Sequence, residues 1–340
     1  MSVSTRRVTL ADVARATGYT VNTVSRALKN KSDISRATCE TIQRVADEMG
    51  YVSNYMASSL RSGRSRTLGV IVGGMSNPFY SIMVDYLHDA AAELGYTVLV
   101  MCSRDHEELE LKSVASQISR QVDGILLYPS YGCEQSLQLM RSAGTPFVLV
   151  SRTPNAPDCD CAVCDEEQGG YLAAKHLIEA GHRKLAFLFA YDVMYSSERR
   201  IRGFRHAADE AGIPPCDLRF YQHTSDDDTQ RQLLAWRREG VTGLFTFCDM
   251  EAWNAISLMH ACGLSVPGDF SVVGFDNIQG KLHFPLPLCT IDSDMEGLAR
   301  AALRLLISRV DGDDSPPRQL VFPSRLVCRE SCGARADRTT

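Results

Sequence analysis

The chain has 340 residues, of which 44% are hydrophobic and 23% charged, the composition of a soluble globular protein with two or three domains. No apolar run approaches the roughly 20 residues that span a bilayer, and the polar N-terminus lacks the apolar core of a secretion signal. We therefore expect a cytoplasmic protein. Residues 1–66 contain eleven Lys or Arg and five Asp or Glu (net +6), whereas the remainder contains 25 and 36 (net −11). A basic segment before an acidic body indicates that this segment meets a polyanion.

Three short helices are predicted first. Thr9 begins a capping pattern with Asp12 and starts a helix that Gly18 ends, because a sharp turn favours a residue without a Cβ. Thr20 precedes a second helix over Val21–Leu28. A third helix runs from about Ser35 to Gly50.

Two helices joined by a tight turn are typical of the helix-turn-helix, whose second helix enters the major groove of DNA. Arg26 suits guanine, Asn22 another base edge, and Val21 a thymine methyl group. Hydroxyl side chains near the helix starts suit phosphates; these are Thr9, Thr20, Thr23, Ser25 and Ser35. The alternative is a small helical bundle that binds no nucleic acid.

The rest of the chain alternates apolar strand-like runs with amphipathic stretches, which predicts two α/β subdomains built on parallel sheets covered on both faces. In such folds ligands bind beyond the carboxyl ends of the strands. The expected strands are residues 68–72, 97–102, 124–129, 147–151, 184–190, 243–248 and 270–275, and the expected helices include Tyr80–Leu94, Gln168–Ala180, Arg200–Ala211 and Glu251–Cys262.

The sequence has no nucleotide-binding or hydrolase motif, and His182 has no nucleophile near it in sequence. We expect no enzyme activity and no cofactor. The twelve cysteines are expected to be reduced thiols. The crowded Cys159, Cys161 and Cys164 lack the spacing of a metal site, so we expect no metal here and interpret this stretch as a loop that enters a strand.

The stretch TLADVARATGYTVNTVSRAL, followed by GYVSNYMASSLRSGRSRTLGVIV, resembles the lactose-repressor family of bacterial regulators. The resemblance implies that Ser53–Leu60 forms a hinge helix that lies in the minor groove when two subunits pair. It makes Leu60 the apolar wedge and adds Tyr51, Asn54 and Ala57 to the DNA contacts. The family usually has proline where this chain has Ser53. The alternative interpretation of this segment is a flexible linker.

Further family-like motifs extend the resemblance over nearly the whole chain, namely SNPFY (76–80), HLIEAGHRKLAF (176–187), RRIRGF (199–204), VPGDFSVVGFDN (266–277) and VCRES (327–331). They imply a body with two lobes around a ligand cleft, similar to periplasmic sugar-binding proteins. The expected divisions are a headpiece over 1–52, a hinge over 53–65, and a body over 66–340 with lobe one at about 66–162 and 293–322 and lobe two at about 163–290 and 323–335.

The resemblance assigns seven residues to the cleft: Asn77, Phe79, Tyr80, Ser196, Arg200, Cys248 and Asp276. Carboxylate, guanidinium and aromatic groups suit a hydroxylated ligand such as a sugar. Cys248, where the family often has Asn, and Ser151, where it often has Asp, each remove a polar partner. For Phe79 and Tyr80, core packing is the alternative.

Together these features predict a homodimeric, operator-binding regulator, a repressor switched by a small metabolite. Two alternatives stay open: control by a protein partner at the body surface, and a binding protein or enzyme whose headpiece is incidental.

Overall fold

The computed structural model describes residues 8–52, 63–154, 158–189, 195–281 and 286–333. The chain forms two compact units, residues 1–65 and residues 66–340, and each is considered by itself. Of the predicted DNA contacts, Asn54, Ala57 and Leu60 lie outside the described residues. Within the described ranges, no helix is long and apolar enough to cross a membrane.

The N-terminal unit has three described helices, α1 (Leu10–Thr17), α2 (Val21–Ala27) and α3 (Arg36–Glu48). The capping pattern is confirmed, because the Thr9 hydroxyl accepts the Asp12 N–H while the Asp12 carboxylate accepts the Thr9 N–H. Gly18 ends α1 at φ 75°, the left-handed conformation that glycine adopts without strain. Val13, Val24 and Ile42 are fully buried between the helices and join them into one small core.

Lobe one of the body holds a six-stranded sheet in the order β11-β5-β4-β3-β1-β2, with every pairing parallel. Helices α5 and α12 cover one face and α6 and α7 the other, as their buried side chains show. The elements are β1 (Thr67–Val72), α5 (Pro78–Glu93), β2 (Thr97–Cys102), α6 (Glu107–Ser119), β3 (Gly124–Leu127), α7 (Glu134–Ser142), β4 (Phe147–Ser151), β5 (Cys161–Cys164), α12 (Met295–Val310) and β11 (Gln319–Phe322).

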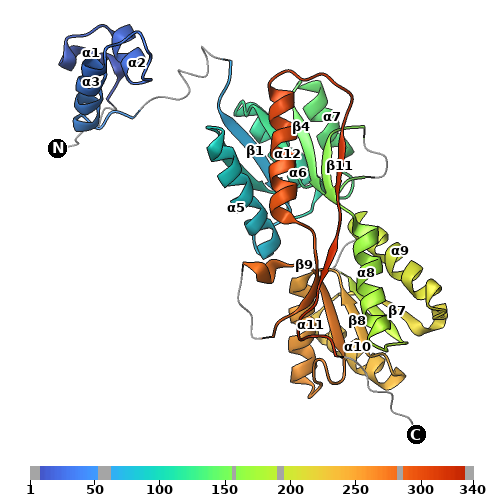
Figure 1. Cartoon of the computed structure of the whole chain (residues 1–340). Helices are drawn as coiled ribbons and strands as arrows, with labels where there is room; N and C mark the ends of the chain where they lie inside the picture. Colours follow the sequence, from blue (N-terminus) through green and yellow to red (C-terminus); the bar gives the residue numbers. More distant parts are fainter. Residues whose placement is uncertain (1–7, 53–62, 155–157, 190–194, 282–285, 334–340) are drawn as a thin grey trace. The chain divides into compact units, whose positions relative to one another are not determined.

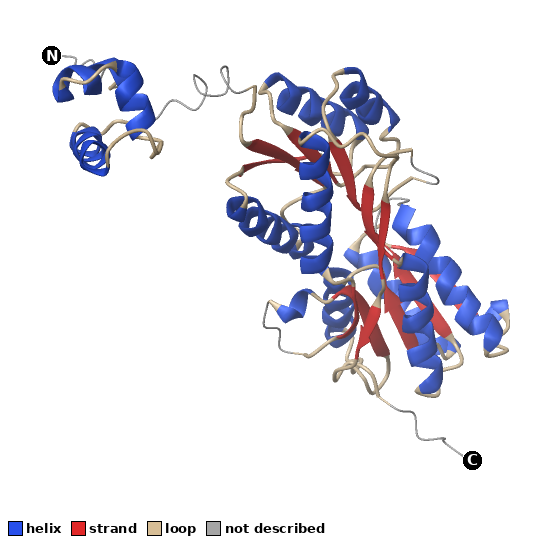
Figure 2. Cartoon of the chain, turned by 45° about the horizontal axis from the view of Figure 1, so that its top comes forward, coloured by secondary structure: helices blue, strands red, loops and turns tan. Residues whose placement is uncertain are grey.

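Lobe two holds a second six-stranded sheet in the order β12-β10-β9-β8-β6-β7, in which only β12 pairs antiparallel. Helices α8 and α9 pack on one face and α10 and α11 on the other. Figure 2 shows the helices flanking the strands in both lobes, as parallel sheets require. The elements are α8 (Glu166–Glu179), β6 (Leu185–Phe189), α9 (Tyr195–Glu210), η1 (Pro215–Asp217), β7 (Leu218–Gln222), α10 (Asp226–Glu239), β8 (Gly243–Thr246), α11 (Asp249–Ala261), β9 (Ser271–Asp276), η2 (Ile278–Gly280), β10 (Cys289–Asp292) and β12 (Arg325–Val327).

The chain passes between the lobes three times, after β5, after β10 and after β11 (Figure 1). Two of these crossings are tied together. The Ser324 hydroxyl donates to the Asp165 carbonyl at 2.8 Å, and the Ser324 N–H donates to Gln168 Oε1 at 2.9 Å. The parallel sheets and the two-lobed body predicted from the sequence are confirmed.

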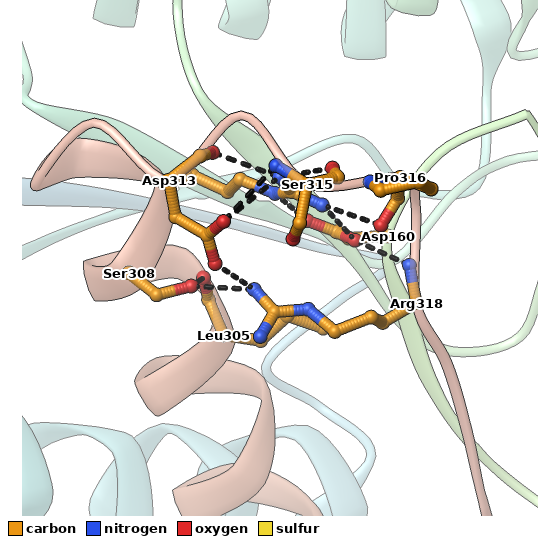
Figure 3. Close-up of polar contacts among 8 residues, drawn as sticks. Asp160, Leu305, Ser308, Asp313, Ser315, Pro316 and Arg318 are labelled. Carbon is orange, nitrogen blue, oxygen red and sulfur yellow. Dashed lines mark hydrogen bonds and ion pairs between the residues drawn. The ribbon is translucent and has the colours of Figure 1, made fainter.

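A polar cluster fixes the end of α12 to β5 and to the segment that leads into β11 (Figure 3). Arg309 donates to both carboxylate oxygens of the buried Asp160, at 2.5 and 3.0 Å. Arg318 Nη2 donates to the Ser308 hydroxyl at 2.6 Å and to Asp313 at 2.8 Å. Bidentate pairing of this kind is geometrically specific, so the cluster holds the start of the edge strand β11, whose other end leads into the third crossing.

The cysteine-rich stretch forms the predicted loop and strand, since β5 begins at Cys161. Cys159, Cys161 and Cys164 are all buried.

Candidate functional sites

The recognition helix α2 presents an exposed face. Val21, Asn22 and Arg26 are exposed, while Val24 and Ala27 on the opposite face belong to the core. The Val21 side chain is 47% exposed and is therefore available to contact a thymine methyl group.

Several predicted phosphate-binding hydroxyls already have structural partners. Thr9, Thr20 and Ser35 are exposed and cap α1, α2 and α3. Thr23 is half-buried, and its hydroxyl lies 2.9 Å from that of Thr20. Ser25 is also half-buried. Thr9, Thr20 and Ser35 therefore support the helix starts whether or not they also meet phosphates.

Arg26 is engaged in an ion pair in this structure. Its Nη2 lies 2.6 Å from Asp33 Oδ2, and both side chains are about half exposed. The pairing raises the pKa of Arg26 and lowers that of Asp33, chiefly through the hydrogen bond between them. An exposed pair of this kind is weak, so a guanine can compete for the guanidinium. The predicted contact at Tyr51 is half-buried against the headpiece core.

The body contains a cleft of about 900 Å³ whose walls come from both lobes. Its residues follow the carboxyl ends of β1, β2, β4, β6, β8 and β9, where parallel sheets place their ligands. All seven residues that the sequence assigned to the cleft line it, namely Asn77, Phe79, Tyr80, Ser196, Arg200, Cys248 and Asp276. Further lining residues that the sequence did not assign include Met75, Arg104, Asp105, Arg152, Phe247 and Glu251.

On the lobe-one wall, Arg152 follows β4 and is buried. It forms an ion pair with Asp105 at 2.9 Å and donates to the Tyr80 hydroxyl. Tyr80 and Phe79 line the cleft and also pack edge to face at 5.3 Å between ring centroids, so they serve both cleft and core. Asn77 caps α5 by accepting the Phe79 N–H at 3.0 Å, which leaves its amide group available.

On the lobe-two wall, Arg200 is held in a fixed place. Its Nε donates to the buried Glu166 carboxylate and its Nη1 to the Phe247 carbonyl. Its guanidinium carbon lies 3.4 Å from the Phe275 ring centroid. Helices α8 and α9 can approach this closely because Gly170 on α8 faces the backbone of Arg200 and Gly203 on α9 faces the backbone of Glu167, where a Cβ would overlap.

Asp276 ends β9 on the same wall, with a φ of 108°. Its carboxylate accepts no hydrogen bond from any described residue, and burial raises its pKa well above the usual range. The neighbouring Asp249 is also buried but paired, accepting from the Thr290 hydroxyl at 2.5 Å and from the Ile278 N–H at 2.9 Å. Burial raises the pKa of Asp249 to about 7. Cys248 is buried beside them, and burial raises the pKa of its thiol.

The cleft lining is balanced in formal charge. It contains three basic residues, Arg104, Arg152 and Arg200, and three acidic ones, Asp105, Glu251 and Asp276. Arg152 and Arg200 are neutralised by carboxylates of their own lobes. Among the described residues of the cleft, Asp276 and the Asn77 amide are polar groups left for a ligand.

A three-helix headpiece and a two-lobed body with a ligand-sized cleft define a class of transcription regulators in which one chain carries both a DNA-binding domain and a small-molecule sensor domain. Residues 9–54 match the family description "Bacterial regulatory proteins, lacI family", and residues 174–332 match "Periplasmic binding protein-like domain". The regulator DegA of Bacillus subtilis is 31% identical over 335 residues, covering 96% of this chain and 98% of DegA. The chain belongs to the lacI family of bacterial regulatory proteins, and it is a DNA-binding transcription regulator.

Other comparisons agree with this assignment. The HTH-type transcriptional repressor PurR of Vibrio vulnificus is 29% identical over 328 residues, covering 95% of this chain and 98% of PurR. The structure of a CelR–cellobiose complex is 28% identical with a TM-score of 0.68, covering 96% of this chain and all of that one. The lac repressor dimer bound to operator is 24% identical with a TM-score of 0.83, covering 97% and 100%, and this likeness shows the fold.

Proposed function

We propose that this regulator is a cytoplasmic repressor that binds a pseudo-palindromic operator as a homodimer. A small, neutral, hydroxylated metabolite of the sugar class fills the cleft and changes operator affinity. The cleft binds this metabolite without catalysing a reaction.

The observation that carries the effector class is the charge balance of the cleft. An anionic effector needs basic groups that are free to meet it. Arg152 and Arg200 are each neutralised by a buried or half-buried carboxylate, so among the basic residues of the lining it is the exposed Arg104 that an anion would have to meet. Asp276 offers an acceptor for hydroxyl groups, and Phe79 and Phe247 offer apolar surface for a ring face. A neutral ligand with several hydroxyl groups meets these conditions. The cellobiose in the CelR complex supports the same class.

The proposal for DNA binding rests on the exposed face of α2. Arg26 exchanges Asp33 for a guanine, while Val21 and Asn22 meet neighbouring bases. One headpiece reads only a few base pairs, so two of them on a two-fold site are needed for specific binding. Asn54, Ala57 and Leu60 stay predicted minor-groove contacts. The PurR relatives, which are named repressors, support the sign of regulation.

The test begins with selection of a preferred site from random DNA, followed by fluorescence anisotropy with that site and a panel of monosaccharides and disaccharides, including cellobiose and ribose. We expect one class of sugar to change operator affinity roughly 5- to 150-fold. Asp276→Asn should abolish this change while operator affinity without sugar is kept. Asp227→Asn, an exposed carboxylate in lobe two, is the matched control.

Three results would contradict the parts of this proposal separately. A selected site without two-fold symmetry excludes the dimeric operator. A switch by an organic anion, when no sugar acts, excludes the sugar class but leaves the operator assignment standing. Conversion of the bound sugar to a product would exclude a purely binding role.

A further inference from the structure

Lobe two contains a cluster of soft metal-binding groups apart from the cleft. A ring nitrogen of His176 and the sulfurs of Cys289 and Cys332 all lie within 4.8 Å of one another. The three residues come from different parts of the sequence. His176 lies on α8, Cys289 begins β10, and Cys332 follows β12. The fold therefore brings together a combination that no spacing in the sequence reveals.

The cluster is distinct from the effector cleft. Cys289 pairs with Val273 in the sheet, three residues before Asp276, which corresponds to about 10 Å along the strand. None of the three residues lines the cleft. On α8, His176 lies ten residues after Glu166, or about 15 Å along the helix.

The chemistry of the cluster fits a thiophilic ion. Two thiolates and one imidazole form a donor set that zinc uses in proteins, with the fourth tetrahedral position open to water. The backbone holds Cys289 firmly, since the Arg329 N–H donates to its sulfur at 3.0 Å. His176 Nε2 is buried without a well-formed hydrogen bond to any described residue. A buried imidazole nitrogen without such a partner is costly, and a metal ion would remove that cost.

The dimensions also agree. Zinc–sulfur bonds of about 2.3 Å and zinc–nitrogen bonds of about 2.0 Å place tetrahedral ligand atoms ~3.5–3.8 Å apart. The present separations, all within 4.8 Å, require the ligands to close by ~1.3 Å at most, which side-chain rotation provides. Cys289 is fully buried, whereas His176 and Cys332 are half-buried, so an ion can enter from the solvent side.

We propose that His176, Cys289 and Cys332 form a zinc-class metal site that fastens the C-terminal segment of the described chain to lobe two. Binding displaces any proton still on the two thiols to solvent, while the imidazole coordinates through its lone pair. The ion would link α8, β10 and the segment around Ser331, which already hydrogen-bonds to Val272 of β9. It therefore adds cross-links between elements that pack but share no covalent bond.

The test uses the full-length protein, reduced with a phosphine and stripped of metal with a chelator. Co²⁺ is the first probe. We expect one equivalent to bind with a sulfur-to-cobalt charge-transfer band in the near ultraviolet and the intense visible absorption of tetrahedral cobalt. Zn²⁺ should displace it and raise the thermal midpoint of the protein.

Cys289→Ser and Cys332→Ser should each remove the charge-transfer band and weaken zinc binding at least about 100-fold, because loss of an outer-shell partner alone costs roughly 10- to 100-fold. His176→Ala should keep a weaker band and lose the tetrahedral visible spectrum. Cys216→Ser, an exposed cysteine in the same lobe, is the matched control and should behave as the unsubstituted protein.

The unsubstituted protein by itself can overturn the proposal, so the result does not depend on whether a variant folds. Absence of the charge-transfer band at one equivalent of Co²⁺ would exclude the site. A band that persists in Cys289→Ser but disappears in Cys216→Ser would locate the metal elsewhere. If mild oxidation joins Cys289 to Cys332 and no metal binds to the reduced protein, the pair is a redox couple and not a metal site.

Discussion

Arg200→Met tests whether the buried Arg200–Glu166 pair holds the lobe-two wall of the cleft. The two side chains are only 6% and 2% exposed. Methionine fills similar volume beside Phe275 but leaves the Glu166 carboxylate buried without its cation. We therefore expect this substitution to destabilise the body as well as to impair ligand binding.

The expected magnitude follows from that burial. Removing one partner of a buried ion pair costs about 3–5 kcal/mol, because the remaining charge stays desolvated. Loss of the guanidinium above the Phe275 ring, at 3.4 Å, adds to this. A domain is commonly stable by about 5–15 kcal/mol, so the change is large enough to measure in denaturant.

Urea unfolding without sugar, followed by tryptophan fluorescence and far-ultraviolet circular dichroism, measures the effect. The two tryptophans of the chain, Trp236 and Trp253, both lie in lobe two, so their fluorescence reports on the lobe that the substitution affects. The free energy of unfolding is compared between the single variants and a double variant.

The double variant Arg200→Met with Glu166→Met is the matched control, because it removes both charges and keeps apolar volume. Replacing a buried pair in this way is often neutral or stabilising. We expect the double variant to be more stable than Arg200→Met alone. If Arg200→Met costs less than about 1 kcal/mol, or if the effects of the two substitutions simply add, the pair does not support the wall as we describe.

Three further predictions follow from the same structure. Asp276→Asn should weaken sugar binding in isothermal titration while leaving the free energy of unfolding nearly unchanged or higher; a destabilised variant that still binds sugar would contradict this. Arg26→Ala should relax base preference at one position of each half-site roughly 10- to 100-fold. Arg44→Ala, which removes the same charge from α3, should change at most the salt dependence of DNA binding. An unchanged selected site in Arg26→Ala would refute the contact. Burial raises the pKa of Asp249 to about 7, so protonated Asp249 favours the folded state. Its contribution to the free energy of unfolding is fully present below a pH of about 4, and up to ~4 kcal/mol of it is lost as the pH rises to about 7. Asp249→Asn should flatten the pH dependence of unfolding over this window, and an unaltered profile would exclude Asp249 as its source.

The sequence predicted the interior of the fold better than its edges. Central strands such as β1 (Thr67–Val72) and β9 (Ser271–Asp276) are continuous apolar runs that are buried in the sheet. A run of this kind is typical of a strand covered on both faces, so the sequence pattern predicts it directly. The edge strand β7 carries a charged residue and is only partly buried, and β12 has three residues, so neither was among the predicted strands. Their places depend on pairing with strands distant in sequence, which local patterns do not encode.

The cleft shows the same division. The family resemblance placed Asn77, Arg200 and Asp276 on one cavity; in the structure Asn77 caps α5, Arg200 lies within α9 and Asp276 ends β9. Their electrostatic state was not predictable. Glu166, the partner of Arg200, begins another helix 34 residues earlier, and its approach depends on the packing of α8 against α9. A sequence therefore identifies candidate groups, but whether a group is free for a ligand depends on tertiary pairing.

That distinction limits which groups can drive the proposed switch. A ligand shifts a balance between two lobe arrangements only through contacts that differ between them. The Arg152–Asp105 pair lies entirely on the lobe-one wall and the Arg200–Glu166 pair on the lobe-two wall, so each can persist in either arrangement. The Asn77 amide nitrogen and the Asp276 carboxylate come from opposite lobes, and neither forms a hydrogen bond with a described residue of the cleft. A hydroxylated ligand that bridges these two groups gains both bonds only when the lobes close on it, and this difference in binding is the free energy available to alter operator affinity.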